Sequence, residues 1–341
     1  MKYFNLRATL FGVLSLFYAV SAMGQGQQIE DDDLNKRAQT GMKFLQTSLD
    51  PRAAGMGDAV TSMEGYSASS VFYNPAGIAR LSSNVNVALG QTQLFADINY
   101  SYASAIFAPA GGAYGSFGAF IMAVDYGDFL GTVRAENEAG FLDTGTYSPT
   151  AMTAGVSYAK LLSDRFAVGA NVKYVFQDLT ETTISADEVK GSSESVIAVD
   201  FGVLYNTGFR SLNFAMSARN FSQEVTYEEE AFELPLTFTI GVSMDMLDLT
   251  NYNTDIHSFV LSVDAERPRD FYEHVNIGGE YSLNNMFFLR AGYAFPTDEQ
   301  GINLGLGLNF DLGNGGVSAN YSFTDFGVLG EVHRIGAAFS F

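Results

Sequence analysis

The stretch Ile302-Asn303-Leu304-Gly305-Leu306-Gly307-Leu308-Asn309-Phe310-Asp311 decides the fold, because its side chains alternate strictly in size and polarity. Every even position in it is large and apolar, and every odd position is small or polar. Successive side chains of a β-strand point to opposite faces, so this segment has one apolar face and one small, polar face. The same alternation recurs in the segments 166–177, 236–245 and 317–324.

The composition of the polar face separates a membrane protein from a soluble one. In these segments it carries mainly Gly, Ser, Ala and Asn rather than the Lys, Glu, Arg and Thr usual at water-facing strand positions. Small residues suit a crowded, concave interior. The apolar face recurs on every strand and no further layer exists to cover it, so it has to meet lipid. The sequence therefore predicts an all-β protein, a transmembrane antiparallel β-barrel whose polar face lines the lumen.

About fourteen segments have the length of roughly ten residues that crosses a bilayer as a tilted strand. They lie at 84–92, 98–107, 115–125, 150–160, 164–178, 194–207, 210–220, 234–245, 256–266, 271–282, 286–295, 301–311, 315–325 and 331–341. Short turns alternate with long loops at 126–149, 179–193 and 221–233, and long loops of such barrels lie outside the cell. Only the connection 246–255 is longer than this rule predicts for the periplasmic side.

The end of the chain fits this architecture. Ile335, Ala337, Phe339 and Phe341 fall on one face of the last predicted strand. A terminal strand that ends in Phe looks like the assembly signal of outer-membrane proteins. We therefore predict that Phe339 and Phe341 close the barrel and are recognised by the outer-membrane assembly machinery.

The first residues read as a secretory signal peptide over 1–24. Lys2 and Arg7 precede an apolar run from Ala8 to Ala22 that is too short for a good bilayer span, and cleavage is expected after Ala22 or Gly24. Residues 25–50 are polar, with the acidic run 30–33, and we expect a solvated periplasmic lead-in with one short helix near 34–44. A calcium site in the acidic run is the alternative.

The segment 51–83 fits neither a long strand nor a long helix, since it is rich in small residues and holds two prolines. We interpret it as a compact plug or hatch inside a barrel formed by 84–341; the alternative is a surface loop with one short helix. Asn74-Pro75-Ala76-Gly77 is expected to form a tight turn in which Gly permits close approach, so Gly77→Val is expected to misfold or open the barrel. The candidate residues of this motif are Arg52, Gly55, Met56, Gly57, Asp58, Asn74, Pro75, Ala76 and Gly77.

The amino-acid composition excludes several kinds of site and partner. The chain has no Cys, so disulfides and thiolate metal sites are excluded, and its formal net charge of −20 argues against nucleic acid as a partner. The three histidines stand in no metal or catalytic motif, so we expect neither enzyme activity nor a cofactor. A barrel lipase that pairs Ser262 with His257 or His274 remains a distant alternative.

Charged residues also occur on the face predicted to line the lumen. They either pair with one another and with the plug, or they shape a passage or a docking surface. The candidates are Lys173, Asp200, Arg219, Asp264, Glu280 and Arg290.

Three motifs carry a family resemblance: Gly41-Met42-Lys43-Phe44-Leu45, Arg52-Ala53-Ala54-Gly55-Met56-Gly57-Asp58-Ala59 and Tyr73-Asn74-Pro75-Ala76-Gly77-Ile78-Ala79. Together they resemble the N-terminal signature of the PorV/PorQ family, which is similar to the FadL-like barrels with fourteen strands and an N-terminal hatch. The resemblance covers the plug closely and the rest of the chain only as architecture.

The resemblance implies one of two functions. PorV-like members serve the type IX secretion system of the outer membrane of Gram-negative cells: they receive secreted proteins by a C-terminal signal domain and hand them to a cell-surface attachment complex. FadL-like members pass hydrophobic compounds such as long-chain fatty acids through the barrel. The motif at 41–44 favours the first, and acidic outer loops suit protein docking better than capture of an anionic fatty acid. The expected partners are therefore the lipid bilayer, secreted cargo with other secretion components, or a hydrophobic small molecule.

Overall fold

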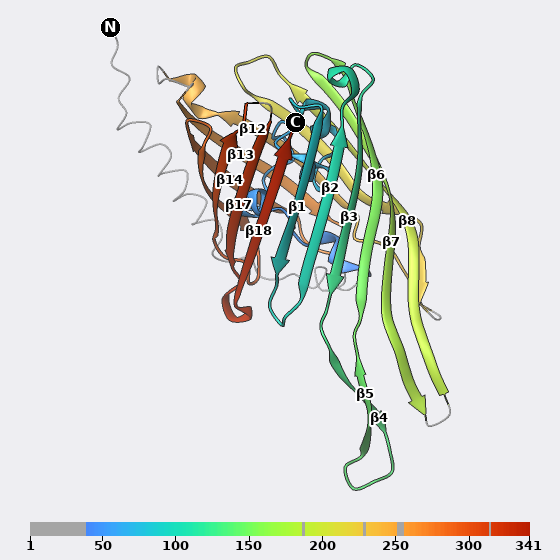
Figure 1. Ribbon diagram of the computed structural model, residues 1–341. Helices are drawn as coiled ribbons and strands as arrows, with labels where there is room; N and C mark the ends of the chain where they lie inside the picture. Colours follow the sequence, from blue (N-terminus) through green and yellow to red (C-terminus); the bar gives the residue numbers. More distant parts are fainter. Residues whose placement is uncertain (1–38, 186–187, 228–229, 251–255, 314) are drawn as a thin grey trace. The chain divides into compact units, whose positions relative to one another are not determined.

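The computed structural model describes residues 39–341 except 186–187, 228–229, 251–255 and 314. Fourteen antiparallel strands close into one barrel (Figure 1), which confirms the predicted fold class and strand number. In chain order they are β1 (Val85–Gln93), β2 (Asn99–Phe107), β3 (Ser116–Asp125), β6 (Thr150–Ser163), β7 (Phe166–Ser185), β8 (Glu188–Asn206), β9 (Asn213–Ser222), β12 (Thr237–Asp245), β13 (His257–Pro268), β14 (His274–Leu283), β15 (Phe287–Phe295), β16 (Asn303–Asp311), β17 (Gly316–Asp325) and β18 (Glu331–Ser340).

The last strand closes the barrel against the first. β18 pairs with β1 over eight residues, with Phe339 opposite Val87. Phe341 N donates to Val85 O at 2.8 Å and Val85 N donates to Phe341 O at 3.1 Å. The Phe341 side chain is 61% exposed. The two C-terminal Phe residues thus lie at the closing seam, and their part in assembly stays a prediction.

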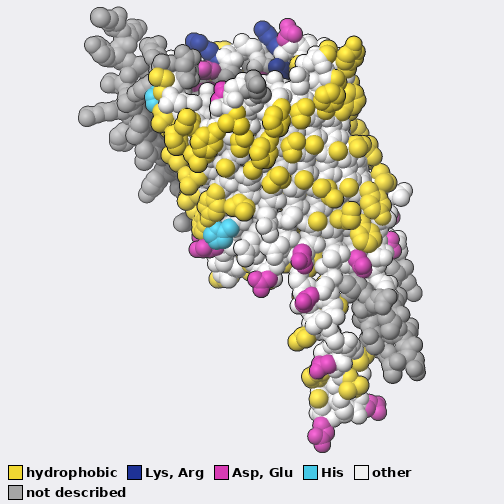
Figure 2. Space-filling model, viewed as in Figure 1, with side chains coloured by type: hydrophobic (Ala, Val, Ile, Leu, Met, Phe, Trp, Pro, Cys, Tyr) yellow, Lys and Arg dark blue, Asp and Glu magenta, His cyan; other side chains and the backbone are white. Residues whose placement is uncertain are grey.

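The alternation of the sequence becomes two faces of the wall. Leu306 on β16 is 54% exposed, whereas Asn303 on the other face of the same strand is 1% exposed. Figure 2 shows the apolar side chains gathered in a band over the barrel wall. Such a band is what a strand barrel presents to lipid. Among the described residues, no helix is long and apolar enough to cross a membrane.

The barrel has two distinct ends. We call the end where β3, β7, β9 and β13 finish the hairpin rim, because the long connections 126–149 and 223–236 leave the barrel there. The opposite end, where β1 begins and β18 finishes, is the terminal rim. Short turns join most strands at the terminal rim, as between β6 and β7 or β14 and β15.

The predicted long loops contain more structure than expected. The connection 126–149 holds the hairpin β4 (Phe129–Arg134) and β5 (Phe141–Tyr147), which extends beyond the barrel (Figure 1). The loop predicted at 179–193 is wrong, since β7 and β8 continue to within two residues of each other. A hairpin keeps its backbone hydrogen bonds in water, so strands do not have to stop at the membrane boundary. The connection 221–233 includes the short pair β10 (Val225–Tyr227) and β11 (Glu230–Phe232).

Residues 40–83, which we call the N-terminal segment, contain only short helices. These are η1 (Lys43–Gln46), α3 (Pro51–Gly55), η2 (Ala68–Phe72) and η3 (Pro75–Arg80). Asp50 caps α3 by accepting hydrogen bonds from Arg52 N and Ala53 N, and Asn74 caps η3 by accepting one from Ala76 N. A proline follows each cap at the first helical position, where its missing N–H costs nothing. Three further short helices, η4 (Pro109–Gly112), η5 (Met246–Leu249) and η6 (Gly327–Leu329), lie in connections.

The expectation of a helix near 34–44 is wrong for residues 39–42, which are not helical. Residues 34–38 lie outside the described part. Thr40 forms a parallel β-bridge with Glu233, and Met42 has a left-handed backbone with φ of 52°. Helix begins only at Lys43, because Thr40 and Gly41 use their backbone groups to bind the connection before β12.

Candidate functional site

The N-terminal segment lies with its backbone directly against the inner wall, at glycines of the strands. A Cβ atom added to Gly278 would lie 2.3 Å from Met56 O, and one added to Gly292 would lie 2.2 Å from Gly57 N. No side chain fits at such distances, so the wall and the segment touch backbone to backbone. The same kind of contact pairs Gly169 with Pro75 and Gly305 with Gly55, whereas Gly202 and Gly336 lie against the side chains of Asn74 and Pro51.

Two glycines of the predicted motif differ in their importance. Gly57 has a φ of 61°, and a Cβ there would lie 2.8 Å from Tyr293 N. Gly77 does not have a positive φ, and a Cβ added there would meet only the side chain of Ser70, at 3.3 Å from its Cβ. The expected tight turn at 74–77 is in fact the first turn of η3. The wall glycines, rather than Gly77, are therefore the positions where added volume has the largest effect.

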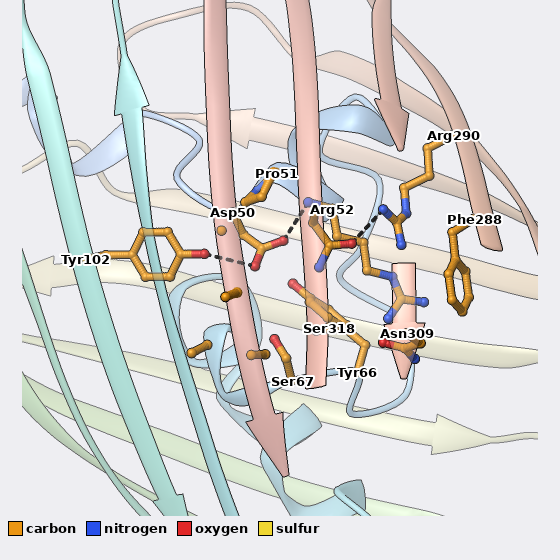
Figure 3. A pocket seen from close by; sticks show the side chains of 15 residues that line it. Asp50, Pro51, Arg52, Tyr66, Ser67, Tyr102, Phe288, Arg290, Asn309 and Ser318 are labelled. Atoms are coloured by element: carbon orange, nitrogen blue, oxygen red, sulfur yellow. Dashed lines mark hydrogen bonds between the residues drawn. The ribbon is translucent and has the colours of Figure 1, made fainter. Parts of the chain in front are cut away.

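Three charged groups, of which Glu280 and Arg290 are buried, join the segment to the wall, and we call them the arginine–glutamate triad; Figure 3 labels its two arginines, Arg52 and Arg290. Arg52 of α3 donates from Nε to Glu280 Oε2 at 2.8 Å and from Nη2 to Glu280 Oε1 at 2.5 Å. Arg290 of β15 donates from Nε to the same Oε2 at 2.5 Å. The side chains of Glu280 and Arg290 are only 4% and 3% exposed. One carboxylate thus fastens α3 to two adjacent strands.

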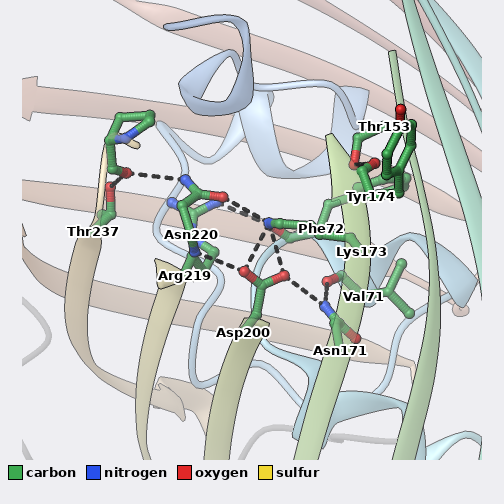
Figure 4. Close-up of polar contacts among 11 residues, drawn as sticks. Val71, Phe72, Thr153, Asn171, Lys173, Tyr174, Asp200, Arg219, Asn220 and Thr237 are labelled. Atoms are coloured by element: carbon green, nitrogen blue, oxygen red, sulfur yellow. Dashed lines mark hydrogen bonds and ion pairs between the residues drawn. The ribbon is translucent and has the colours of Figure 1, made fainter. Parts of the chain in front are cut away.

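A second cluster joins three strands around Asp200 (Figure 4). Lys173 Nζ donates to both carboxylate oxygens of Asp200, at 2.7 and 2.9 Å. Asn171 Nδ2 donates to Asp200 Oδ2 at 2.9 Å and to Val71 O of the segment at 2.8 Å. Asn220, with φ of 66°, donates its N–H to Asp200 Oδ1 where the β8–β9 register shifts. Sequence analysis missed both asparagines, although Asn171 follows the inward alternation.

The two remaining predicted lumen charges also contact the segment. Asp264 Oδ2 accepts a hydrogen bond from Thr61 N at 2.9 Å. Arg219 Nη1 donates to Phe72 O at 3.0 Å, and Arg219 Nη2 lies 3.8 Å from Glu266 Oε1. Glu266 was missed by sequence analysis. The structure therefore places all six predicted charges inside the barrel, where they bind one another or the N-terminal segment.

A further contact, unforeseen from the sequence, holds the start of the described chain at the hairpin rim. Thr40 Oγ1 donates to Asp270 Oδ2 at 2.6 Å, and Lys43 Nζ pairs with the same carboxylate. Gly41 N donates to Glu233 O at 3.1 Å. We call these contacts the rim clasp. Thr40 and Asp270 are 230 residues apart, so no local pattern could have connected them.

One cavity lies between α3 and strands β15 to β18. Its volume is about 40 Å³, room for about three water molecules. Figure 3 shows Asp50, Arg52, Arg290 and Asn309 among the residues around it. Its lining is mainly polar, so it suits water better than an apolar ligand.

The structure does not assemble the distant lipase alternative. Ser262 is fully buried on the inner face of β13, and its Oγ lies 3.5 Å from Val242 O. His257 is on the same strand at an odd position, which points outward, and its Nδ1 lies 2.7 Å from Tyr281 OH. Ser262 pairs with Gly278 and His274 with Glu266, four positions apart, which is roughly 13 Å along a strand. No Ser–His pair forms from these residues.

The buried carboxyl group of Asp58 is expected to make the stability of the protein depend on pH. Burial raises the pKa of its carboxyl, against the lowering effect of the hydrogen bond from Ser48 Oγ and the charge of Arg334. A carboxyl whose pKa is raised by folding adds stability that is complete below its unfolded pKa and is lost as pH rises through the folded pKa. The Asp58→Asn variant carries no such charge, and Asn tolerates the φ of 63° at this position.

We therefore expect the wild-type protein to gain stability relative to Asp58→Asn as pH falls from about 8 to about 4. Urea unfolding of both proteins in lipid vesicles across this range measures the difference. Ser48→Ala removes a donor to the carboxylate and is expected to widen the difference. A difference that does not change with pH contradicts the assignment.

The closed strand barrel, with its apolar outer band, defines the class of the protein: an outer-membrane β-barrel. The family of the type IX secretion system protein PorV matches residues 30–259, and the chain belongs to this family. No curated protein matches the chain.

Solved structures share the barrel fold at low sequence identity. The toluene transporter TbuX of Ralstonia pickettii is 13% identical, with a TM-score of 0.56, over 86% of this chain and 97% of that one. The toluene transporter TodX of Pseudomonas putida is 13% identical, with a TM-score of 0.55, over 84% and 96%. A FadL homologue of Pseudomonas aeruginosa is 12% identical, with a TM-score of 0.50, over 86% and 97%. These likenesses show the FadL-like barrel fold.

Proposed function

We propose that this barrel acts in type IX protein secretion, where it binds secreted proteins by their C-terminal signal domain and delivers them to a cell-surface attachment complex. Membership of the PorV family supports the pathway. The observation that carries the docking step is the β4–β5 hairpin, which forms a two-stranded sheet of its own. Leu130 and Leu142 on it are 82% and 55% exposed. A free sheet edge beside exposed apolar side chains can accept a strand of a β-rich partner.

The rest of the molecule serves this role as a sealed membrane platform. The hairpin rim faces the cell exterior and the terminal rim faces the periplasm, as long loops and strand ends of such barrels require. Residues 51–83 act as the plug, held by the arginine–glutamate triad and the wall glycines. The signal peptide, cleaved after Ala22 or Gly24, exports the chain, and the protein does its work without catalysis.

Transport of hydrophobic compounds is the second candidate, and the barrel fold shared with toluene transporters favours it. Ligand pockets for apolar compounds are lined mostly by hydrophobic and aromatic side chains. The cavity beside α3 is small and polar, and the lumen charges are engaged in pairs. These features support docking over conduction.

A pull-down of the tagged protein from its native outer membrane in mild detergent, followed by mass spectrometry, tests the proposal. We expect the wild type to recover secreted proteins that share a C-terminal domain, and Leu130→Asn/Leu142→Asn to lose them. The control is Leu312→Asn at the terminal rim, where a leucine is 67% exposed, between the values of Leu130 and Leu142; it should recover them normally. Recovery of the barrel alone, with apolar molecules in its lipid extract, would favour the transporter.

A further inference from the structure

The cavity between α3 and strands β15 to β18 opens at the terminal rim. Asn309 lines it from the inner face of β16, near the terminal-rim end of that strand, and is exposed. Ser318 and Asn320 line it from β17 and are half-buried. In the hairpin-rim half of the same two strands, the inner-face residues Asn303 and Thr324 are each only 1% exposed. This side of the lumen is therefore filled toward the hairpin rim and open toward the terminal rim.

Two guanidinium groups line the deeper part of the cavity. Arg290 pairs with Gly305, which lies further from the terminal rim than Asn309 does on the same strand. Arg290 donates from Nε to Glu280 and from Nη1 to Asn320 Oδ1, whereas Arg52 donates to Glu280 from Nε and Nη2. A guanidinium has five N–H donors. Arg290 Nη2 and Arg52 Nη1 are thus left without an acceptor among the described residues.

The carboxylate of Asp50, which also lines the cavity, does not need these donors. Its Oδ1 accepts hydrogen bonds from Arg52 N at 2.8 Å and Ala53 N at 3.1 Å. Its Oδ2 accepts them from Ser69 Oγ at 2.5 Å and Tyr102 OH at 3.3 Å. An ionised carboxylate has about four acceptor sites, so Asp50 is satisfied by the protein. What the cavity lacks is an acceptor, and two guanidinium groups favour one that is negatively charged.

We propose that this cavity binds a small oxyanion, a carboxylate or a phosphate, which enters at the terminal rim and accepts hydrogen bonds from Arg52 and Arg290. The planar guanidinium matches the oxygens of both groups. The volume of about 40 Å³ admits one such group and not a long acyl chain. The bound anion joins α3 to β15, as Glu280 does, and so holds the N-terminal segment more firmly. With the orientation given in the proposed function, the anion comes from the periplasm.

Urea unfolding of the protein in detergent micelles tests the site, because both rims are then open to solvent. Sodium chloride is replaced, at constant ionic strength, by sodium phosphate in one series and by sodium acetate in another. A ligand that binds only the folded protein, at ten times its dissociation constant, raises the folding equilibrium constant about elevenfold. Phosphate also stabilises proteins generally by exclusion from their surface, so variants have to separate the two effects.

Two variants change the site in different ways. Asn309→Asp places a carboxylate at the mouth of the cavity, where it repels or displaces a free anion. Arg52→Met removes one of the two guanidinium groups and leaves the Glu280–Arg290 pair intact. The matched control is Asn285→Asp, which adds the same charge in the exposed turn between β14 and β15 at the same rim. Asp tolerates the positive φ of 52° there.

We expect the wild type and Asn285→Asp to gain stability equally, and Asn309→Asp and Arg52→Met to lose the gain. A gain in one series alone identifies the anion as phosphate or as carboxylate. If the wild type gains nothing, or if Asn309→Asp and Arg52→Met gain as much as it does, the proposal is overturned and only the general salt effect remains. Should Arg52→Met not fold, Asn309→Asp decides the result. Recovery of cargo in the pull-down is a separate measurement, so failure here leaves the secretion proposal standing.

Discussion

Gly278→Ala is expected to lower the free energy of unfolding of the barrel by about 2–3 kcal/mol, the range of a severely overpacked core. The new methyl group would lie 2.3 Å from Met56 O, so either α3 or strand β14 has to move. The contacts that depend on this fit include the triad, because Arg52 lies in the same short helix as the residues before Met56. Urea titration of the protein folded in lipid vesicles measures the loss.

The matched control is Gly279→Ala, one residue further along β14. A Cβ added to Gly279 would point to the outer face of the barrel and would meet only the ring of Phe259, at 3.3 Å. Because Phe259 is 37% exposed, its ring is free to shift. We expect this variant to remain within about 1 kcal/mol of the wild type. Equal losses in the two variants would show that glycine matters for the strand itself and not for its contact with the segment.

The barrel was predictable because its signal is local. The alternation from Ile302 to Asp311 sets which of its side chains face lipid without any knowledge of the neighbouring strands. The same alternation within β14 and β15 places Glu280 and Arg290 inside. The pairing partners of these charges were not predictable. The segment around Arg52 has no repeating pattern, so its sequence does not specify which strands of the wall it contacts.

Other features were missed for different physical reasons. The β4–β5 hairpin looked like a loop because strand lengths were judged by bilayer thickness, which sets no limit outside the membrane. The bulge at Asp200 and Asn220 adds one residue to β9 relative to β8, and a strict period of two cannot show where it occurs. In the rim clasp, Thr40 and Lys43 lie 230 and 227 positions from Asp270.

Glu280→Gln tests how firmly charge holds the N-terminal segment. The substitution keeps the shape of the side chain but leaves Arg290, 3% exposed, and Arg52, 19% exposed, without their shared carboxylate partner. Breaking a buried ion pair from one side costs about 3–5 kcal/mol, and we expect a loss of that size in urea unfolding. Arg52→Met removes one cation and leaves the Glu280–Arg290 pair balanced, so its loss should be smaller.

The comparison of single and double variants separates two ion pairs: Arg52–Glu280, which joins α3 to the wall, and Arg290–Glu280, which lies within the wall. Because Arg52 loses its carboxylate partner only when Glu280 is replaced, the double variant Arg52→Met/Glu280→Gln, which has no Arg52 cation to leave unpaired, should lose less than the sum of the two single changes. Glu273→Gln breaks a pair with Arg267 whose side chains are 64% and 70% exposed, and should stay within about 0.5 kcal/mol of the wild type. If Glu280→Gln lost no more than this surface control, hydrogen bonding and backbone fit, rather than charge, would hold α3 against the wall.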